Sequence, residues 1–265
     1  MKKTIYTIIA ISLLVALFYI QRYQNQEISD QNIENASSDN TAFSRADFLP
    51  ESTNQIIHHK TYSLSYNEQH EQAEWTLHIL KSSDIKSANY KRPYFEIDEM
   101  VSTGAASWRN YKNSGYDRGH LVPAGDRRAS IEDYNETFLT SNISPQRHDF
   151  NAGIWNRLEQ KVRYFAQREN GIYVITGSVL KGNLKSIGTE NVSVPKQFYK
   201  IIYKKSKGKN SMLAFLLPHE ETGRSIYDFV VPVDSIEQLT GTDFFAQLPD
   251  EIEKELESSV SRKGW

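Results

Sequence analysis

Two stretches, His58 to Tyr66 and Ala73 to Leu80, alternate apolar and polar residues. A period of two is typical of β-strands, because successive side chains point to opposite faces of a sheet. The two stretches are close in sequence, so we expect them to form a strand pair. One face of the second strand would then carry Trp75, Leu77 and Ile79.

The segment from Ala152 to Arg168 has the clearest helical pattern of the chain, and Gly171 follows it as a stop signal. Apolar residues recur in this segment at steps of three and four, which places them on one face of a helix. These residues are Ile154, Leu158, Val162, Phe165 and Ala166.

Two shorter helices are predicted by their capping residues. One runs from Ile131 to Leu139, with Ser130 as its N-cap. The other runs from Val233 to Leu239 and would be capped by Asp234 or Ser235.

Three further strands are predicted at residues 172–177, 197–204 and 211–217. The first and third are almost continuously apolar. Strands of this kind are typical of the centre of a sheet, where both faces are covered.

The N-terminus begins with Lys2 and Lys3 and continues with an uncharged, mostly apolar run from Ile5 to Ile20. Basic residues before an apolar run are typical of an export signal. The length of the run leaves two alternatives for residues 1–22, a signal peptide or a membrane anchor formed by residues 4–20. No Ala-x-Ala cleavage site follows, which favours the anchor. In both cases we expect an extracytoplasmic protein, either membrane-anchored or secreted or periplasmic.

Residues 23–55 are dominated by Asn, Gln, Ser, Asp and Glu. So polar a segment cannot bury enough apolar surface to offset the entropy that is lost on ordering. We therefore predict a disordered tether, followed by one folded domain at residues 56–265. The chain has no cysteine, which excludes disulfides, thiolate metal sites and a cysteine nucleophile.

The formal net charge of −2 is unlike that of most nucleic-acid-binding domains, which are basic. Positive charge is nevertheless concentrated between residues 181 and 210. The lysines there are Lys181, Lys185, Lys196, Lys200, Lys204, Lys205, Lys207 and Lys209, and the opposing charge is Glu190. Such a stretch is usually a solvated face, but a surface that binds nucleic acid remains an alternative. The segment from Asp250 to Glu257 is acidic.

Candidate chemistry centres on the tetrapeptide Asp117-Arg118-Gly119-His120. On an extended segment, Arg118 and His120 share one face, and Gly119 between them would let a ligand approach closely. Histidine can accept a proton near neutral pH, and arginine can hold a phosphate oxygen. Asp117 points the other way, so we expect it to be a structural partner. Four other histidines lack a metal-ligand spacing, and we expect them at the surface or at sheet edges: His58, His59, His70 and His78.

Asn151 and Glu159 flank the start of the long helix and could supply oxygen ligands to a hard cation such as Mg²⁺. On a regular helix, residues eight apart are separated by about 12 Å along the axis. Glu159 would therefore act through water, or the backbone around Asn151 departs from a regular helix. Arg163 lies one turn beyond Glu159, where a surface ion pair is the alternative to a role in the site.

Three blocks of sequence, in this order and at these distances, form a distinctive set. They are Tyr-Asp-Arg-Gly-His-Leu-Val-Pro-Ala-Gly-Asp (116–126), Leu-Thr-Ser-Asn-Ile-Ser-Pro-Gln (139–146) and Asn-Ala-Gly-Ile-Trp-Asn-Arg-Leu-Glu (151–159). The set resembles the DNA/RNA non-specific endonucleases, which are ββα-metal, endonuclease G-like enzymes, and the similarity covers residues 56 to 250. It implies an α+β fold with a central, mainly antiparallel sheet flanked by helices.

The resemblance also implies roles for individual residues. His120 would be the general base that activates water, Asn151 the direct ligand of Mg²⁺, and Glu159 the residue that holds a water ligand of that ion. Mn²⁺ or another divalent cation could replace Mg²⁺. The residues implied to lie near the phosphate or to support the site are Arg92, Arg118, Arg163 and Asn142.

The resulting hypothesis is an exported, Mg²⁺-dependent endonuclease that hydrolyses single- or double-stranded DNA and RNA. Contacts mainly to phosphate and sugar carry little sequence information, so broad substrate acceptance is expected. Two alternatives stay open. One is a catalytically inactive surface module that binds nucleic acid through the lysines of residues 181–210, and the other is a metal phosphodiesterase for small substrates. The sequence predicts no oligomeric state.

Overall fold

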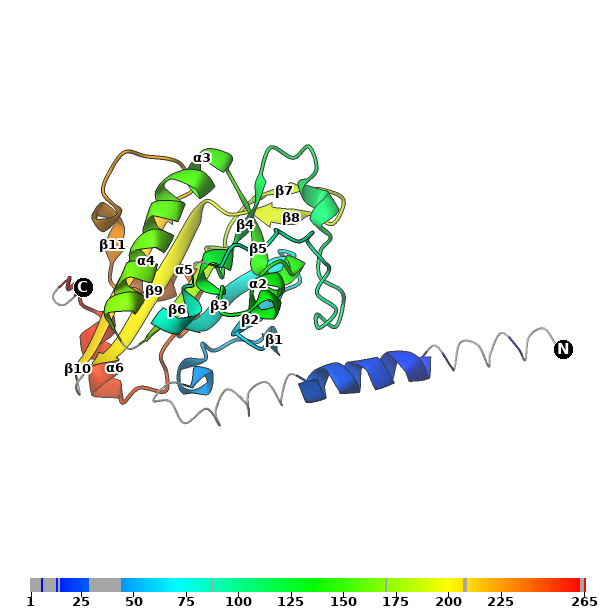
Figure 1. The fold of residues 1–265 in the computed structure, drawn as a ribbon, viewed down its shortest axis with the longest axis horizontal. Helices are drawn as coiled ribbons and strands as arrows, with labels where there is room; N and C mark the ends of the chain where they lie inside the picture. Colours follow the sequence, from blue (N-terminus) through cyan, green and yellow to red (C-terminus); the bar gives the residue numbers. More distant parts are fainter. Residues whose placement is uncertain are drawn as a thin grey trace.

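The computed structural model describes residues 44–86, 88–169, 171–206, 209–262 and 265, together with residues 6, 13 and 15–28 near the N-terminus. A twisted sheet is at the centre of the fold, and helices lie on both sides of it (Figure 1).

The main sheet has seven strands in the order β1-β2-β3-β6-β9-β10-β11, and every neighbouring pair is antiparallel. Its strands are β1 (Gln55–His58), β2 (Tyr62–Asn67), β3 (Gln72–Leu80), β6 (Ile172–Ser178), β9 (Gln197–Ser206), β10 (Lys209–Pro218) and β11 (Val230–Val231). Two small antiparallel sheets accompany it: β4 (Asp117–His120) pairs with β5 (Ile143–Gln146), and β7 (Lys185–Ile187) pairs with β8 (Val192–Val194).

Helices and strands together make a mixed fold. The helices are α2 (Ile131–Glu136), α3 (His148–Phe150), α4 (Asn156–Arg168), α5 (Val233–Thr240) and α6 (Asp250–Glu257), with a π-helical turn, η6 (Asn151–Trp155). Short 3₁₀ helices are η1 (Arg45–Phe48), η2 (Ser82–Asp84), η3 (Trp108–Tyr111), η4 (Ala124–Asp126), η5 (Thr140–Asn142) and η7 (Ile226–Phe229). The predicted α+β class, with a mainly antiparallel sheet flanked by helices, is confirmed.

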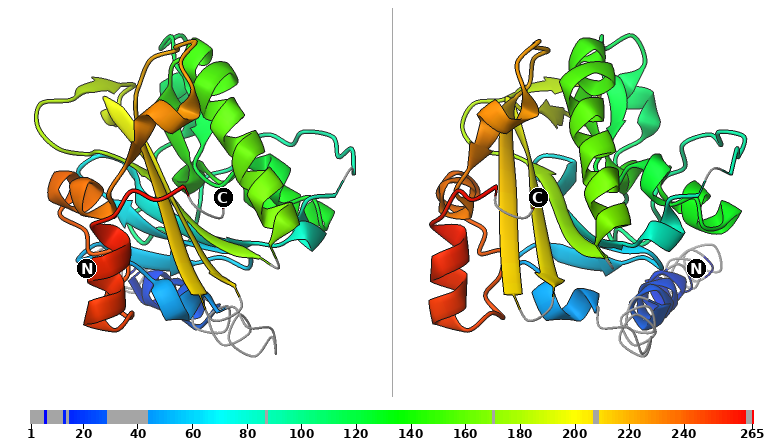
Figure 2. Two further views of the ribbon diagram at one scale, coloured as in Figure 1. Left: turned by 90° about the vertical axis from the view of Figure 1, so that its left-hand side faces the viewer. Right: turned by 60° about the vertical axis from the view of Figure 1, so that its left-hand side comes forward.

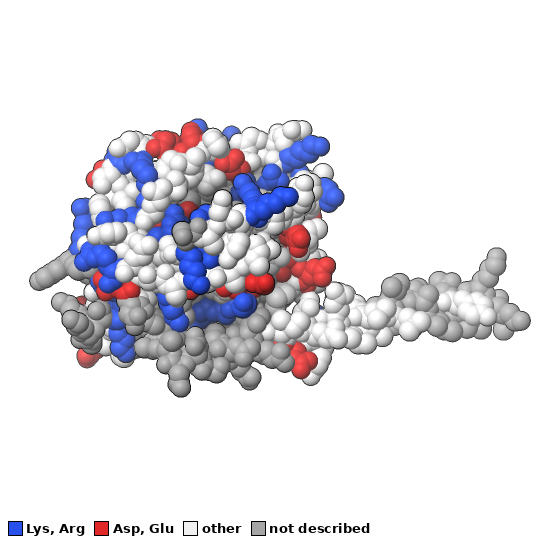
Figure 3. Space-filling view, viewed as in Figure 1, with Lys and Arg blue, Asp and Glu red and all other residues white. Residues whose placement is uncertain are grey.

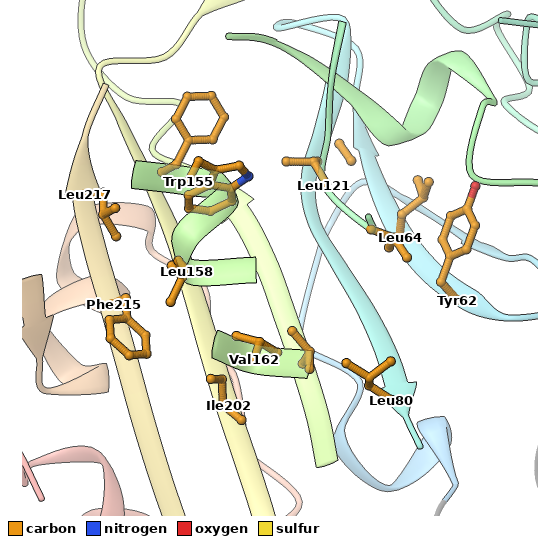
Figure 4. Packing of buried hydrophobic residues seen from close by; sticks show 14 of the residues in the cluster. Tyr62, Leu64, Leu80, Leu121, Trp155, Leu158, Val162, Ile202, Phe215 and Leu217 are labelled. Atoms are coloured by element: carbon orange, nitrogen blue, oxygen red, sulfur yellow. The ribbon is translucent and has the colours of Figure 1, made fainter. Parts of the chain in front are cut away.

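The two faces of the main sheet are covered by different helices (Figure 2). On one face, Leu158 and Val162 of α4 belong to the same buried cluster as Ile202 and Phe215 of β9 and β10 (Figure 4). On the other face, α5 contributes to a separate cluster that contains Trp75 and Leu77 and packs against Ile79. The predicted shared face of Trp75, Leu77 and Ile79 is therefore confirmed. Full burial of each large apolar side chain contributes about 1.5–3 kcal/mol.

The predicted strand from His58 to Tyr66 is wrong in its extent. β1 ends at His58 and β2 starts at Tyr62, and the two strands pair with each other. Between them the backbone N–H groups of Lys60 and Thr61 donate to the carboxylate of Glu136, at 2.8 and 3.1 Å. The carboxylate of Glu136 on α2 thus accepts the hydrogen bonds that a neighbouring strand would otherwise accept.

Of the two predicted helix starts, one is confirmed and one is wrong. Ser130 caps α2 as expected, because its hydroxyl accepts from the backbone N–H of Asp133 at 3.1 Å. The cap predicted for α5 is wrong: Pro232 occupies the N-cap position, and no side chain caps it. Proline sets a backbone angle suited to the start of a helix, so Asp234 and Ser235 lie within the first turn.

The packed structure starts earlier than the predicted boundary at residue 56. Arg45 is 3% exposed and donates to the carbonyl of His59 at 2.8 Å, and the ring of Phe48 contacts that of Tyr173 at 4.7 Å. Residues 15–28 are helical, which also differs from the tether predicted from residue 23. The tether prediction was wrong for residues 44–55. It was based on polar composition, which does not reveal the contacts that Arg45 and Phe48 make with the folded domain.

Most of the predicted export segment at residues 1–22, and the tether at residues 29–43, lie outside the described residues. Within the described part of the chain, no helix combines the length and apolar content needed to cross a membrane. The signal peptide or anchor stays a prediction.

Several charged or polar residues that were expected at the surface are buried. Lys200 and Lys204 belong to the basic stretch, yet they are 1% and 6% exposed, because their strand lies in the middle of the sheet. The surface or edge positions expected for His59 and His78 are also wrong, since both are buried, whereas His58 does lie on the edge strand β1, although it is buried there. On the face that carries α4, lysine and arginine side chains are interspersed with acidic ones (Figure 3).

Candidate active site

Strand β4 presents Arg118 and His120 next to each other on one side. It pairs with β5 so that Gly119 lies opposite Ser144 and His120 opposite Ile143. The role expected for Gly119 was wrong. A Cβ atom there would come within 2.2 Å of the side chain of Gln146, so the glycine makes room for a buried neighbour and not for a ligand.

His120 lies between two aromatic rings, with centroid distances of 5.5 Å to Phe95 and 4.8 Å to Phe138. Its Nε2 atom is buried and has no hydrogen-bond partner among the described residues. Burial, and then the positive charge of Arg92, lowers the pKa of His120 to about 3. The imidazole is therefore neutral at physiological pH, with a nitrogen that can accept a proton.

Asn151 lies where the backbone is not a regular α-helix. The chain passes from α3 through the π-helical turn η6 into α4, and Gly153 has the non-helical angles φ −94° and ψ −111°. A Cβ atom at Gly153 would lie 1.8 Å from the Glu221 carboxylate, which accepts from the N–H of Ile154 at 2.6 Å. The backbone around Asn151 therefore departs from a regular helix, as one of the two alternatives for Asn151 and Glu159 required.

Asp117 fixes the orientation of the Asn151 amide. Its Oδ2 atom accepts from Asn151 Nδ2 at 3.0 Å and contacts His148 Nδ1 at 2.9 Å. Because the carboxylate only accepts, the amide must turn its nitrogen toward Asp117, which leaves its oxygen for the cleft. The structural role expected for Asp117 is therefore to orient the side-chain amide of Asn151.

One cleft of about 370 Å³ brings the candidate residues together. Among the predicted residues, its walls contain His120, Asn151, Glu159, Arg92, Arg118 and Arg163. Segments that are distant in sequence therefore converge on one site, as the hypothesis requires.

Arginines dominate the charge of the cleft. Arg92 and Arg118 place their guanidinium groups 5.6 and 5.2 Å from the ring centre of Phe95. Stacking of this kind holds the cations in place and leaves their N–H groups for an anion. Arg128 also lines the cleft, and its buried Nε atom has no partner among the described residues. Sequence reasoning missed Arg128, although it is only the second residue after the 116–126 block.

Glu159 lies in the wall of the cleft and interacts with a largely buried group of charges. Arg163 donates to Asp126 at 2.8 Å and lies 3.9 Å from Glu159. Its main partner is therefore the buried Asp126, and the alternative of a simple surface ion pair with Glu159 does not describe it. Burial raises the pKa of Glu159, Asp126 raises it further, and Lys200 and Arg163 oppose the shift. Burial lowers the pKa of Lys200, against the effects of Glu159 and Asp126.

Lys200 is a second residue whose relation to the site was missed. Its ammonium group donates to Thr176 Oγ1 at 2.5 Å and lies 5.0 Å from the ring centre of Trp155. Its position in an alternating, lysine-rich strand gave no sign of burial. A signal could have come from the large neighbours Phe198, Tyr199, Ile201 and Ile202, which mark a strand covered on both faces.

Asn142 is fully buried and does not line the cleft. Its side chain accepts from the N–H of Val122 at 2.9 Å and donates to the carbonyls of Val122 and Thr137, at 3.0 and 2.9 Å. It therefore ties together the backbone that follows His120. This arrangement can support the site but cannot contact a substrate.

The cleft has donors that fit a hard divalent cation. The amide oxygen of Asn151 is oriented by Asp117, and the Glu159 carboxylate is 15% exposed with a weak, 3.9 Å ion pair to Arg163. A buried carboxylate whose pKa is raised gains from a nearby cation, and oxygen ligands are those that Mg²⁺ prefers.

Comparisons with known proteins agree with this geometry. Residues 39–251 match the family described as DNA/RNA non-specific endonuclease. The chain is 32% identical over 217 residues to "Nuclease EXOG, mitochondrial" of Danio rerio, covering 76% of this chain and 63% of that protein. It is 34% identical over 216 residues to "Endonuclease G, mitochondrial" of Caenorhabditis elegans, covering 74% and 70%. A crystal structure of an EndoG/EndoGI complex matches with a TM-score of 0.71 at 29% identity, over 75% of this chain and 88% of that one.

The chain spans 56–63% of the length of the EXOG nucleases that it matches. The matched region from residue 39 to residue 251 contains the whole cleft and the whole main sheet. The resemblance inferred from the sequence blocks is confirmed: the chain belongs to the DNA/RNA non-specific endonuclease family.

Proposed function

We propose that this protein is a metal-dependent endonuclease that hydrolyses the phosphodiester bonds of DNA and RNA without sequence preference. The observation that supports this best is the convergence of His120, Asn151 and several arginines on one cleft. A base, an oriented amide oxygen and fixed cations are what hydrolysis of a phosphodiester requires.

In the proposed reaction, His120 takes a proton from a water in the cleft through an imidazole nitrogen. The water oxygen forms a bond to phosphorus while the bond to the leaving oxygen breaks on the opposite side. A bound phosphodiester carries negative charge, which offsets the effect of Arg92 on the imidazole. Substrate binding therefore raises the pKa of His120 toward the range in which a histidine is an effective base.

The arginines of the cleft hold the phosphate. Arg92, Arg118 and Arg128 offer guanidinium N–H groups, which bind phosphate oxygens in a fixed geometry. Asn151, with Glu159 acting through water, would hold a divalent cation, for which Mg²⁺ is the first candidate and Mn²⁺ another. Such a cation supplies Lewis-acid stabilisation of the charge that develops on the phosphate.

Broad substrate acceptance follows from the nature of these contacts. Arginines that bind phosphates do not read bases, so both DNA and RNA fit the cleft. With a net charge of −2, the chain has no general attraction for nucleic acid, and affinity must come from the local arginines. We expect cleavage to weaken steeply with rising salt, because each neutralised phosphate releases counterions.

The proposal is tested by incubating the full chain with plasmid DNA and with RNA, in the presence of Mg²⁺ or EDTA. His120→Ala should lower the rate by about 10²–10⁴-fold, which is the usual contribution of a general base. His70→Ala is the matched control, since His70 lies outside the cleft and bonds Ser193 at 2.9 Å. Undiminished cleavage by His120→Ala would remove this residue from its role.

The same assay separates the alternatives. Cleavage of small model diesters but not of polymers would indicate a small-substrate phosphodiesterase. Salt-sensitive binding without cleavage, independent of metal, would indicate an inactive binding module. The burial of Lys200 and Lys204 weakens that last alternative, because its binding surface was the basic stretch.

We also propose that the protein is exported, on the basis of Lys2, Lys3 and the apolar run to Ile20. Fractionation of cells that produce the full chain tests this. Recovery of the protein only from the cytoplasm would contradict it.

A further inference from the structure

Three carboxylates meet between α5 and α6. Asp234 and Glu237 are three residues apart on α5, which places them on the same side of that helix, and Glu257 is the last residue of α6. One oxygen atom from each carboxylate lies within 4.8 Å of the other two. Both helices lie on the side of the sheet away from α4 (Figure 2), so this cluster is separate from the cleft.

The Glu257 carboxylate lacks a hydrogen-bond partner for one of its oxygens among the described residues. The residue is 5% exposed, and its buried Oε1 atom has no hydrogen-bond partner among the described residues. An unpaired carboxylate is costly to bury. The end of a helix also carries partial negative charge, so the last turn of α6 favours a cation and disfavours the Glu257 side chain alone.

The surrounding charges further disfavour an ionised carboxylate at Glu257. Burial, and then the carboxylates of Glu237, Glu253, Asp243 and Asp234, together raise the pKa of Glu257 to about 8. A helix surface would normally intersperse such charges with lysine or arginine. Here the neighbouring groups that act on Glu257 all repel it.

From this geometry we infer that Asp234, Glu237 and Glu257 form a binding site for Ca²⁺ that joins α5 to α6. Ca²⁺ binds carboxylate oxygens at 2.3–2.6 Å in flexible geometry, so one ion can reach three oxygens that lie within 4.8 Å of one another. Mg²⁺ demands near-ideal octahedral geometry and usually keeps several waters, so it is less suited to three carboxylates from two helices. The backbone N–H of Phe244 donates to Glu237 Oε1 at 3.0 Å and fixes that carboxylate in place.

This site has a structural consequence. The chain between α5 and α6 contains Phe244, Phe245 and Leu248, which belong to the core cluster on this face of the sheet. An ion shared by the two helices holds the ends of that segment together. Ca²⁺ should therefore stabilise the folded protein by mass action.

The test uses the full chain carrying Asn151→Ala, so that a cation in the cleft does not contribute. Thermal unfolding is measured in EDTA and in millimolar CaCl₂ or MgCl₂, and calorimetry gives the stoichiometry of Ca²⁺ binding. We expect the unfolding temperature to rise with Ca²⁺, a smaller rise with Mg²⁺, and one Ca²⁺ bound per chain.

Variants of single carboxylates locate the ion. Asp234→Asn and Glu237→Gln should each weaken Ca²⁺ binding by at least roughly 10–100-fold, since loss of a group that merely supports a metal ligand already costs that much. Glu257→Gln should raise the unfolding temperature in EDTA, because it removes a carboxyl group that must take up a proton to be buried, and should abolish the response to Ca²⁺. Glu255→Gln is the matched control, since Glu255 is an exposed residue of the same helix, and it should respond as the parent does.

Two results would overturn the inference. One is an unfolding temperature that does not respond to Ca²⁺ while Glu257→Gln is more stable, which would mean that Glu257 is simply protonated. The other is a Ca²⁺ response that persists undiminished in the Asp234, Glu237 and Glu257 variants.

Discussion

Asp117→Asn is the substitution that tests most directly how the cleft presents Asn151. The Asp117 carboxylate accepts from Asn151 Nδ2 at 3.0 Å, so the Asn151 amide oxygen faces the cleft. An asparagine at this position can still accept one hydrogen bond, but it offers no charge and can turn its own NH₂ group toward Asn151. The amide of Asn151 would then have no fixed orientation.

The size of the effect follows from the bond that is weakened. A hydrogen bond to a charged group contributes about 1.5–3 kcal/mol and a neutral one about 0.5–1.5 kcal/mol. The difference of about 1–2 kcal/mol corresponds to a factor of roughly 5–30 in a binding equilibrium. We therefore expect Asp117→Asn to raise the Mg²⁺ concentration needed for half-maximal cleavage by about that factor.

The assay is plasmid cleavage as a function of Mg²⁺ concentration. High Mg²⁺ should restore most of the rate, because the substitution changes occupancy of the cation site and not the chemistry at His120. His148→Ala is the matched control: its ring is the other partner of Asp117, but it is 82% exposed and water can replace it. A rate loss that Mg²⁺ cannot restore, or an unchanged Mg²⁺ dependence, would refute this account of Asn151.

Three further predictions concern the buried charges and the core. Lys200→Met should raise the pKa of Glu159, since Lys200 lowers it, and should move the acidic limb of the activity profile to higher pH; an unmoved profile would separate Lys200 from the site. The pKa values of His78 and His120 are lowered to about 4 and about 3, so the unfolded chain binds more protons as the pH falls below 6.5. These two histidines should make the stability measured by urea unfolding fall with decreasing pH in that window, by up to about 1.4 kcal/mol per pH unit each, while the raised pKa values of Glu159 and Glu257 act in the opposite direction; an unchanged pH dependence in His78→Gln would contradict the shift of His78. Leu158→Ala should cost about 2–5 kcal/mol of unfolding free energy, because the side chain is fully buried against the sheet; a loss well below that range would mean that the core closes over the cavity.

Local patterns were enough to predict the main elements of the fold. The long helix, the strand with Trp75 and Leu77 on one face and the Ser130 cap each depend on neighbouring residues, so a periodic or capping signal reveals them. The break between β1 and β2 depends instead on Glu136, which is distant in sequence. The early start of the packed structure depends on a few contacts of Arg45 and Phe48 inside a polar segment.

In the candidate site, too, local sequence revealed some features, and others depend on residues distant in sequence. His120 and Asn151 could be identified from the sequence because each lies in a distinctive block that resembles one family. The surroundings that give these residues their properties could not. The low pKa of His120 arises from burial and from Arg92, and Lys200 acts on Glu159 of α4 from strand β9 of the main sheet.

The backbone at Asn151 shows why the geometry of such a site escapes sequence reasoning. A regular helix would separate Asn151 from Glu159 along its axis, and the sequence offers only Gly153 as a sign of a break. What makes the break specific is Glu221, whose carboxylate occupies the space next to Gly153, accepts from the N–H of Ile154 and pairs with Arg157 at 3.0 Å. Glu221 follows β10, far along the chain, so the conformation that brings an amide into the cleft is set by tertiary contact and not by local propensity.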